Sequence, residues 1–277
     1  MSVWFVTGAS RGLGLEIVKA ALDRGDEVVA TARDPRAIEQ SLGTSAGLLA
    51  LPLDVTSQDQ ADEAVRQAIA RFGRIDVLVN NAGRGLVGAV EETSDAEARA
   101  VFDINVFGLL TVLRAVVPTM RAARAGRILN ISSTGGVVAW AGWGVYSATK
   151  FALEGITEAL RLELAPLGIQ VTSVQPGPLR TDFLASSSLG QVERVIADYA
   201  PTGGASREWA GANHGLQEGD PVKAAGALTT LVDLDEMPAR LPLGTSTLAD
   251  IRAKLAAVGA ELEEWQELSR STDVVPA

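Results

Sequence analysis

Short apolar runs rich in β-branched residues alternate with longer amphipathic stretches along the chain, and this alternation constrains the fold more than any other feature. The apolar runs, predicted to be buried strands, lie at residues 3–7, 27–32, 48–52, 76–79, 127–131, 169–174 and 240–243. The stretches predicted to be helices lie at residues 13–24, 57–72, 95–120, 147–165, 186–199, 221–234 and 247–269. Strands joined through helices form right-handed crossovers. The pattern therefore predicts an α/β protein with a doubly wound parallel sheet and helices on both faces.

No linker interrupts this alternation before about residue 183, so we predict a single domain over residues 1–277. Residues 184–220 differ because they are rich in serine and glycine and carry little periodicity. Long irregular segments inside a compact domain are often binding loops or lids. We therefore predict a mobile substrate loop at about 184–220, followed by a helical tail at about 247–269.

Charge and composition exclude several classes of function. The chain has 24 basic and 34 acidic residues, a formal net charge of −10, which disfavours binding to nucleic acid because the phosphate backbone is repelled. It has no cysteine and one histidine. Disulfides, thiolate catalysis and cysteine-ligated zinc are thereby excluded, and a serine–histidine–aspartate hydrolase is disfavoured. We predict no metal site.

The same reading predicts a soluble cytoplasmic protein with no membrane partner. The most apolar stretch, residues 101–118, carries Asp103 and Arg114, so we do not expect it to span a bilayer. The apolar residues at the N-terminus have no basic segment before them, which is unlike a signal peptide.

A glycine-rich turn follows the first predicted strand and opens the first predicted helix. It reads Thr7-Gly8-Ala9-Ser10-Arg11-Gly12-Leu13-Gly14. Glycines let backbone amides approach a diphosphate, and a helix N-terminus adds further amides and a favourable dipole. The turn therefore predicts a dinucleotide site, although tight packing of strand against helix is an alternative reason for the glycines.

The end of the second predicted strand indicates which dinucleotide is bound. An acidic residue there favours NAD, whereas an arginine favours the 2′-phosphate of NADP. The sequence has Arg33 at this place, and Arg11 lies within the glycine-rich turn. Because guanidinium groups bind phosphate through paired, charge-assisted hydrogen bonds, we predict NADP(H) as the cofactor. The alternative is that both arginines are ordinary surface residues.

Tyr146 and Lys150 are four residues apart in a predicted helix, which places them on one face. A nearby ammonium favours the phenolate and lowers the pKa of a phenol toward neutrality. The pair therefore predicts a proton donor and acceptor, with a surface tyrosine beside a lysine as the alternative. Ser133 follows another predicted strand, and ligands in parallel sheets bind beyond the carboxyl ends of the strands.

Taken together, these motifs resemble the short-chain dehydrogenase/reductase family over about residues 3–183. The matching positions are Thr7, Gly8, Gly12, Gly14, Asp54, Val55, Asn80, Asn81, Ala82, Gly83, Asn105, Ser133, Tyr146, Lys150, Pro176 and Gly177. The resemblance implies a Rossmann-type sheet of seven strands and hydride transfer with a nicotinamide cofactor. It implies that Tyr146 is the general acid or base, that Lys150 lowers the pKa of Tyr146 and holds the nicotinamide ribose, and that Ser133 binds the substrate oxygen. Asn105 would hold a water that relays protons to Lys150.

The resemblance and the phosphate-binding argument together give a set of expected cofactor contacts. These are Gly8, Ser10, Arg11, Gly12, Leu13, Gly14, Arg33, Asp54, Val55, Asn81, Ala82, Gly83, Tyr146, Lys150, Pro176, Gly177 and Thr181. For Asp54 and Asn81 the alternative is that they are only turn-forming residues at the ends of strands.

The expected substrate pocket is apolar. It comprises Val137, Val138, Trp140, Trp143, Phe183 and Leu184. We therefore predict an NADP(H)-dependent reduction of a hydrophobic ketone or aldehyde, or oxidation of a secondary alcohol. The alternatives are an NAD-dependent alcohol or steroid dehydrogenase of the same family and a catalytically silent dinucleotide-binding regulator. The family commonly pairs subunits through helices near residues 99–120 and 147–165, so the resemblance also implies a homodimer or homotetramer.

Overall fold

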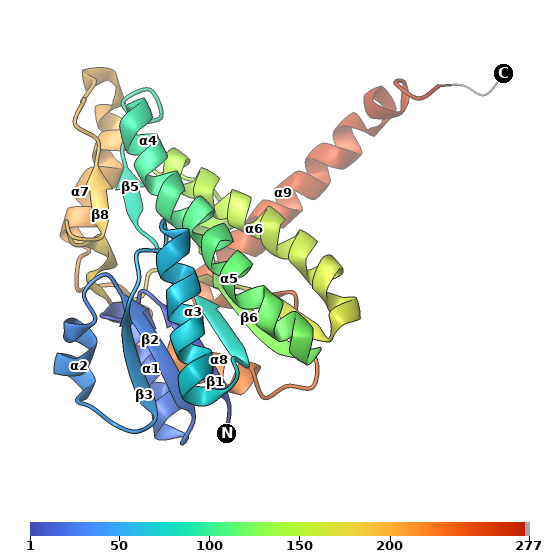
Figure 1. The fold of residues 1–277 in the computed structure, drawn as a ribbon. Coiled ribbons are helices and arrows are strands. Elements are labelled where there is room, and N and C mark those ends of the chain that lie inside the picture. The colour runs from blue at the N-terminus through green and yellow to red at the C-terminus, as the bar shows by residue number, and fades with distance from the viewer. Residues whose placement is uncertain (275–277) are drawn as a thin grey trace.

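A computed structural model describes residues 1–274 and contains the predicted parallel sheet (Figure 1). Its seven strands, in spatial order, are β3 (Leu48–Pro52), β2 (Glu27–Ala32), β1 (Val3–Thr7), β4 (Val77–Asn80), β6 (Gly126–Ile131), β7 (Ile169–Pro176) and β9 (Arg240–Leu243). Every neighbouring pair is parallel. The predicted α/β fold and the number of strands in the sheet are confirmed.

Each face of the sheet is covered by its own helices. Helices α1 (Gly12–Asp23) and α8 (Pro221–Leu231) pack on one face, and α3 (Gln58–Phe72), α5 (Gly108–Ala123) and α6 (Gly144–Leu164) pack on the other. Successive side chains of a strand point to opposite faces. In β1, Trp4 and Val6 accordingly join the core under α1, whereas Phe5 joins the core under α3. The continuous apolar runs of the sequence are thus explained by burial on both faces.

The order of the strands reverses between β1 and β4. The chain runs outward from β1 through β2 to β3, and then returns to the other side of β1 with β4. At such a point the loops after the two strands diverge and leave a crevice at the carboxyl ends, which is where open α/β sheets bind ligands. The glycine-rich turn follows β1, and the Asn81–Gly83 segment follows β4. The two segments therefore face each other across this crevice.

The predicted helix at 95–120 is interrupted in the structure. It comprises α4 (Asp95–Phe102), a π-helical turn at Asp103–Phe107, and α5. This run is long and apolar enough to cross a membrane by length and composition, but half of its most apolar window is buried inside the protein. Its apolarity is therefore accounted for by the core between the sheet and α3. The π-helical turn is a structural distortion that periodicity alone does not reveal.

The segment at 184–220 is more ordered than we predicted, and the predicted helix at 186–199 is wrong. The strand β8 (Leu189–Gln191) pairs there with β5 (Gly85–Val87), and a helix, α7 (Ala205–Ala212), follows a π-helical turn at Ala200–Gly204. Ser186 to Ser188 and Gly190 are weak helix formers, and pairing with β5 outweighs helix propensity. Together with β5 these elements form a small lobe above the crevice, which we call the substrate lobe (residues 182–219).

Two other short elements were not predicted, and the predicted tail helix makes few contacts with the rest of the protein. Helix α2 (Arg36–Leu42) and strand β5 are too short to give a clear periodic signal. The predicted tail helix is present as α9 (Thr245–Arg270), and it stands away from the body of the protein (Figure 1). Within α9 only Thr247 is buried.

Candidate active site

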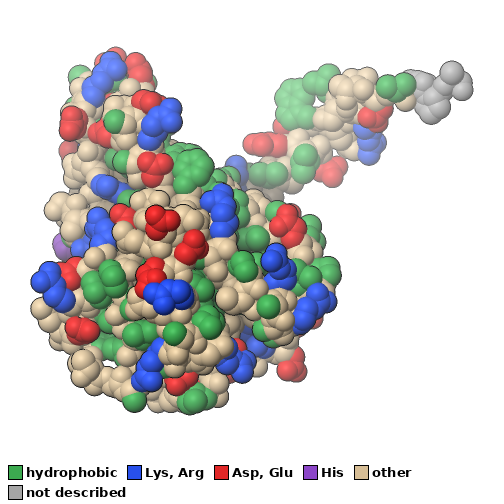
Figure 2. Space-filling model, viewed as in Figure 1, with side chains coloured by type: hydrophobic (Ala, Val, Ile, Leu, Met, Phe, Trp, Pro, Cys, Tyr) green, Lys and Arg blue, Asp and Glu red, His purple; other side chains and the backbone are tan. Residues whose placement is uncertain are grey.

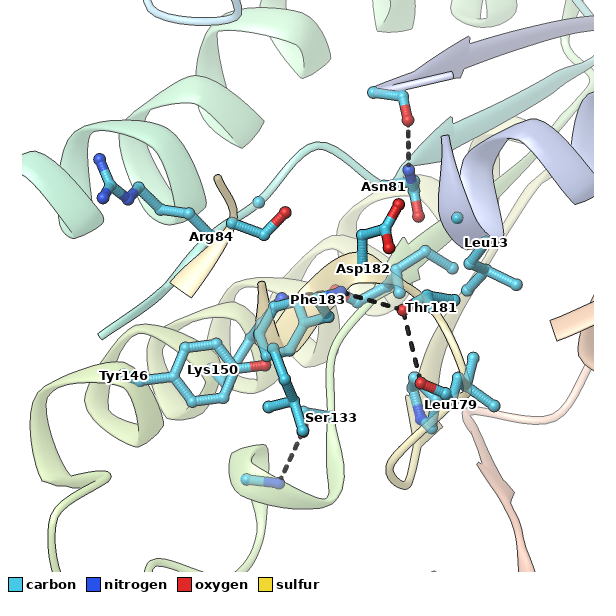
Figure 3. A pocket seen from close by; sticks show the side chains of 18 of the residues that line it. Leu13, Asn81, Arg84, Ser133, Tyr146, Lys150, Leu179, Thr181, Asp182 and Phe183 are labelled. Carbon is cyan, nitrogen blue, oxygen red and sulfur yellow. Dashed lines mark hydrogen bonds between the residues drawn. The ribbon is translucent and has the colours of Figure 1, made fainter. Parts of the chain in front are cut away.

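A cavity of about 1210 Å³ opens over the carboxyl edge of the sheet. One wall is formed by the glycine-rich turn and the ends of β2 and β4, and the other by α6 and the substrate lobe. Ligand pockets are usually about 300–1,000 Å³, so this cavity has room for a dinucleotide together with a second small molecule. Tyr146, Lys150 and Ser133 lie near one another within it (Figure 3).

The glycine-rich turn has the geometry that a diphosphate requires. Gly8 and Gly12 have φ values of +64° and +56°, which only glycine adopts readily. No side chain caps α1, and no acidic residue lies in its first turn, so its first amides remain available to an anion. A Cβ at Gly14 would clash with the Gly8 carbonyl and the Asn81 amide, so Gly14 serves the close packing of the turn rather than the cavity wall.

Asn81 holds this turn in place. Its side-chain Nδ2 donates to the carbonyls of Thr7 and Gly8 at 2.9 and 3.0 Å, and its backbone N–H donates to the Thr7 hydroxyl at 3.0 Å. Asn81 also lines the cavity. The residue therefore ties the loop after β4 to the loop after β1, a role more specific than turn formation.

The two arginines expected near the 2′-phosphate are engaged differently. Arg33 is exposed, lines the cavity, and has no hydrogen-bond or salt-bridge partner among residues 1–274. Arg11 instead donates to the Ser187 hydroxyl and carbonyl at 2.9 and 3.1 Å and to the Ser188 hydroxyl at 2.9 Å. In this structure Arg11 thus links the glycine-rich turn to the substrate lobe and does not serve the phosphate position.

Asp54 lies at the same end of the cavity as Arg33. Its carboxylate accepts hydrogen bonds from the Thr56 amide at 3.0 Å and the Thr56 hydroxyl at 2.7 Å. The bond from the Thr56 amide, supported by that from the hydroxyl, lowers the pKa of Asp54 below its usual value. Asp54 is therefore an acceptor at neutral pH and fits the hydrogen-bond donors of an adenine ring. Val55 lines the cavity beside it.

Tyr146 and Lys150 project from the first turns of α6 into the cavity. The Lys150 ammonium lies 5.9 Å from the centre of the Tyr146 ring and donates to the Ile131 carbonyl at 2.9 Å. The Ser133 hydroxyl accepts from the Gly135 amide at 3.0 Å, which fixes its position at the end of β6. The three side chains predicted to carry the chemistry are thus brought together by one helix and one strand (Figure 3).

Burial dominates the proton affinities of this cluster. It raises the pKa of the Tyr146 phenol to about 12, which a hydrogen bond with Ser133 opposes only partly. Burial also lowers the pKa of Lys150 to about 8, against the attraction of the Glu154 carboxylate. The expected lowering of the Tyr146 pKa by Lys150 is therefore not seen here, because the loss of hydration on burial dominates the pKa. Lys150 is therefore a weaker base than an exposed lysine.

Asn105 lies in the π-helical turn and does not line the cavity. Its Oδ1 accepts from the Arg84 amide at 2.9 Å, and its Nδ2 donates to the Arg84 carbonyl at 2.9 Å and the Thr149 hydroxyl at 3.0 Å. Both amide hydrogens are thus used to join the loop before β5 to α6. This position makes Asn105 a positioning residue, and its predicted role in holding a water remains a prediction.

The substrate end of the cavity is aromatic. Trp143 lies edge-on to both Tyr146 and Trp209, with ring centres 5.9 and 6.5 Å apart, and Phe183 lies 5.7 Å from Tyr146. Trp140 and Leu184 also line the cavity. Val137 and Val138, which follow the short 3₁₀ helix at Thr134–Gly136, do not line it. We did not predict Trp209 or Leu216, which the folding of the substrate lobe brings to the wall.

Most of the expected cofactor contacts line the cavity. These are Gly8, Ser10, Arg11, Gly12, Leu13, Arg33, Asp54, Val55, Asn81, Ala82, Gly83, Tyr146, Lys150, Pro176, Gly177 and Thr181. Gly14 is the exception, for the packing reason given above. The residues present therefore fit a dinucleotide: glycines at the diphosphate, free amides at a helix N-terminus, and polar side chains at both ends.

Comparison with known proteins identifies the family. The family model for short chain dehydrogenase matches residues 2–191. Oxidoreductase BOA17 of Botryotinia fuckeliana is 36% identical over 269 residues, which are 96% of this chain and 97% of that protein. The 3-ketodihydrosphingosine reductase of Bacteroides thetaiotaomicron is 40% identical over 195 residues, 70% of each chain.

Solved structures agree with the sequence relatives. A short-chain dehydrogenase from Streptomyces avermitilis has a TM-score of 0.91 at 42% identity and covers 99% of this chain and 100% of its own. A serine dehydrogenase complexed with NADP+ has a TM-score of 0.74 at 26% identity over 87% of this chain and 94% of its own. The fold, the site and the comparisons together show that this chain is an oxidoreductase of the short-chain dehydrogenase/reductase family.

Proposed function

We propose that this protein is an NADP(H)-dependent oxidoreductase that interconverts a hydrophobic ketone or aldehyde and the corresponding alcohol, with Tyr146 as general acid and base. The observation that carries the proposal is that Tyr146, Lys150 and Ser133 line the same cavity as the glycine-rich turn. A phenol and a hydroxyl there can both reach the oxygen of a carbonyl compound. A nicotinamide bound in this cavity would supply or accept the hydride.

The proton chemistry follows from the burial of Tyr146. With a pKa near 12, the phenol is protonated at neutral pH and is poised to donate as negative charge grows on the substrate oxygen. Ser133 donates its hydroxyl hydrogen to the same oxygen. Lys150 would hold the ribose hydroxyls of a bound nicotinamide and, when charged, stabilises the phenolate left after proton transfer. In the oxidative direction the phenolate, which a charged Lys150 favours over the neutral phenol, accepts the alcohol proton.

The preference for NADP(H) rests on Arg33. Its guanidinium is exposed at the end of β2, without a partner in the described chain, and no acidic residue occupies its place. A serine dehydrogenase with the same fold binds NADP+, which supports the proposal. The substrate class rests on the aromatic wall around Trp143 and on the similarity to a 3-ketodihydrosphingosine reductase.

The replacement Tyr146→Phe tests the proposed acid. It removes the phenolic oxygen and keeps the ring, so we expect turnover to fall by about 10²-fold or more while NADPH binding is retained. Turnover is followed as NADPH absorbance with a panel of ketones and aldehydes, and binding by calorimetry.

The other tyrosine of the chain provides the control. Tyr199 lies in the substrate lobe, and its hydroxyl donates a hydrogen bond to the Glu91 carboxylate at 2.6 Å. It does not line the cavity, so Tyr199→Phe is expected to leave turnover unchanged. Wild-type activity in Tyr146→Phe would remove Tyr146 as the acid. A wild-type protein that binds NADPH but reduces nothing in the panel would favour a silent regulatory protein instead.

A further inference from the structure

Helix α9 presents an apolar face that nothing in the described chain covers. After Thr247 every side chain from 248 to 270 is exposed or half-exposed. Leu255, Leu262 and Trp265 are 61%, 68% and 56% exposed. Figure 2 shows the helix standing clear of the body with hydrophobic side chains along it. A long isolated helix gains little stability in water without packing partners, so this face points to an interaction.

The apolar residues of α9 follow a heptad repeat. Leu248, Leu255 and Leu262 are spaced by seven residues and occupy position a. A second row, three residues further on in each heptad, occupies position d and consists of Ile251, Val258 and Trp265. No row of large apolar residues continues on the opposite side, where alanines in the first half of the helix give way to glutamates in the second. The pattern is that of a coiled-coil seam, which requires another helix.

We propose that α9 pairs antiparallel with α9 of a second copy of this chain. In an antiparallel pair each a residue packs against a d residue of the partner. When Leu255 faces Val258 of the second copy, Leu248 faces Trp265 and Ile251 faces Leu262. A two-fold axis repeats these three contacts, so the six seam positions of each helix are covered at one register. Leu268 falls at position g and lies outside the seam. At this register residues 267–270 of each helix extend past Thr247 of the other.

Charge selects the antiparallel arrangement over the parallel one. The flanking g positions are Lys254 and Glu261, and antiparallel helices bring g positions together. At the register above, Lys254 of each helix flanks Glu261 of the other. Parallel helices would pair g with e positions. This would place Gly259 opposite Lys254, Gln266 opposite Glu261 and Arg252 opposite Thr247, and none of these pairs carries opposite charges. Parallel helices would also bring their glutamate-rich ends, residues 261–267, against one another.

The proposed register separates the roots of the two α9 helices. Helix α9 has 26 residues, and the register places the two roots at Thr247 roughly 30 Å apart along the pair. Each body therefore lies beside the far end of the other helix. Ser246 and Asp250 line the cavity mouth, so the pair would also fix the root of α9 next to the site. This interface is separate from the helices through which the family commonly pairs.

Replacement of Leu255 at the centre of the seam tests the proposal in the full-length protein. Because Leu255 is exposed within one chain, Leu255→Asp is expected to leave the fold intact and to halve the mass measured by light scattering. Ala256→Asp introduces the same charge one residue away, outside the seam, and is expected to keep the wild-type mass. Equal masses for Leu255→Asp and wild type, with native circular dichroism, would overturn the proposal, as would a monomeric wild type.

The direction of pairing is tested separately. The chain has no cysteine, so Leu248→Cys/Trp265→Cys carries the only two thiols. After mild oxidation and proteolysis, mass spectrometry is expected to find residue 248 joined to residue 265 of the other chain. Joining of 248 to 248 would show parallel helices and contradict the proposed register. Lys254→Glu is expected to weaken the dimer several-fold, and Lys254→Glu/Glu261→Lys to restore it. All readouts are independent of enzymatic activity.

Discussion

At the scale of single residues, two arginines near the dinucleotide site have different surroundings and therefore different expected effects. Arg33 is exposed at the end of β2 and has no partner within residues 1–274, whereas Arg11 is held by Ser187 and Ser188. A guanidinium without a partner loses no existing hydrogen bond when it meets a phosphate. Arg33 therefore carries the proposed discrimination between NADPH and NADH, and Arg11 connects the turn to the substrate lobe.

The replacement Arg33→Asp tests this assignment. A carboxylate repels the 2′-phosphate and accepts hydrogen bonds from the ribose hydroxyls of NADH, so we expect the ratio of kcat/KM for NADPH over NADH to fall at least about tenfold. The ratio is measured with one ketone substrate under fixed salt. Arg36→Asp is the matched control because Arg36 lies three residues away, pairs with Asp34 and does not line the cavity. An unchanged ratio in Arg33→Asp would contradict the assignment.

At the scale of elements, a buried ion pair holds the substrate lobe to the rest of the protein. Glu92, in the loop before α4, is fully buried, and its carboxylate forms an ion pair with the Arg207 guanidinium of α7 at 2.6 Å. It also accepts from the amides of Ala89 and Ile196 at 2.8 and 2.9 Å. These hydrogen bonds lower the pKa of Glu92 from 4.5 to about 2, and the bond from Arg207 has the largest effect. The charged form of Glu92 therefore stabilises the docked lobe.

This pair predicts a particular response to acid. Because the pKa of Glu92 is lowered in the folded state, its contribution is complete above pH 4.5 and is lost as the pH falls toward about 2. Glu92→Gln is expected to be less stable than wild type at pH 7 and to lose less stability between pH 4.5 and 3. Urea unfolding midpoints at these pH values measure both effects. Glu39→Gln, on the exposed face of α2, serves as control; parallel pH profiles for wild type and Glu92→Gln would contradict the prediction.

Elements with strong periodicity could be predicted from sequence, and those fixed by tertiary contacts could not. The strands of the main sheet are apolar on both faces, and their limits were predicted to within two residues at nearly every end. The strand β8 has three residues and exists because β5 lies beside it. Likewise the π-helical turn at Asp103–Phe107 depends on Asn105 bonding to Arg84 and Thr149. Hydrogen bonds between residues far apart in the sequence leave no local periodic signal.

The same distinction applies to the site. Gly8, Ser133, Tyr146 and Lys150 were predicted because motif spacing and strand ends place them at one edge of the sheet. The placement of Val138 was wrong because the turn after Ser133 directs it away from the cavity. The direction of a side chain in an irregular loop depends on backbone angles, which a motif does not specify. Trp209 reaches the cavity only through the docking of α7.

At the scale of the whole molecule, the cavity is bounded by two parts that meet only at its edges. The sheet supplies the glycine-rich turn, and the substrate lobe supplies Phe183 and Trp209 of the aromatic wall. Arg11 and the ion pair of Glu92 with Arg207 join these parts. A dinucleotide lying along the carboxyl edge would contact both, so its binding is coupled to the stability of the entire chain.

This coupling predicts a change in thermal stability that distinguishes the two cofactors. A ligand at about 100 times its Kd stabilises the folded state by roughly 2.7 kcal/mol, which corresponds to a rise in Tm of about 5–10 °C for a chain of this size. We expect NADPH to produce such a rise, NADH at the same concentration to produce less, and Arg33→Asp to narrow the difference. Tyr146→Phe is expected to keep the full NADPH effect, because it removes a proton donor and leaves the phosphate contacts in place. Calorimetric scans at one protein concentration measure all four, and equal rises with NADPH and NADH in the wild type would contradict the proposed cofactor preference.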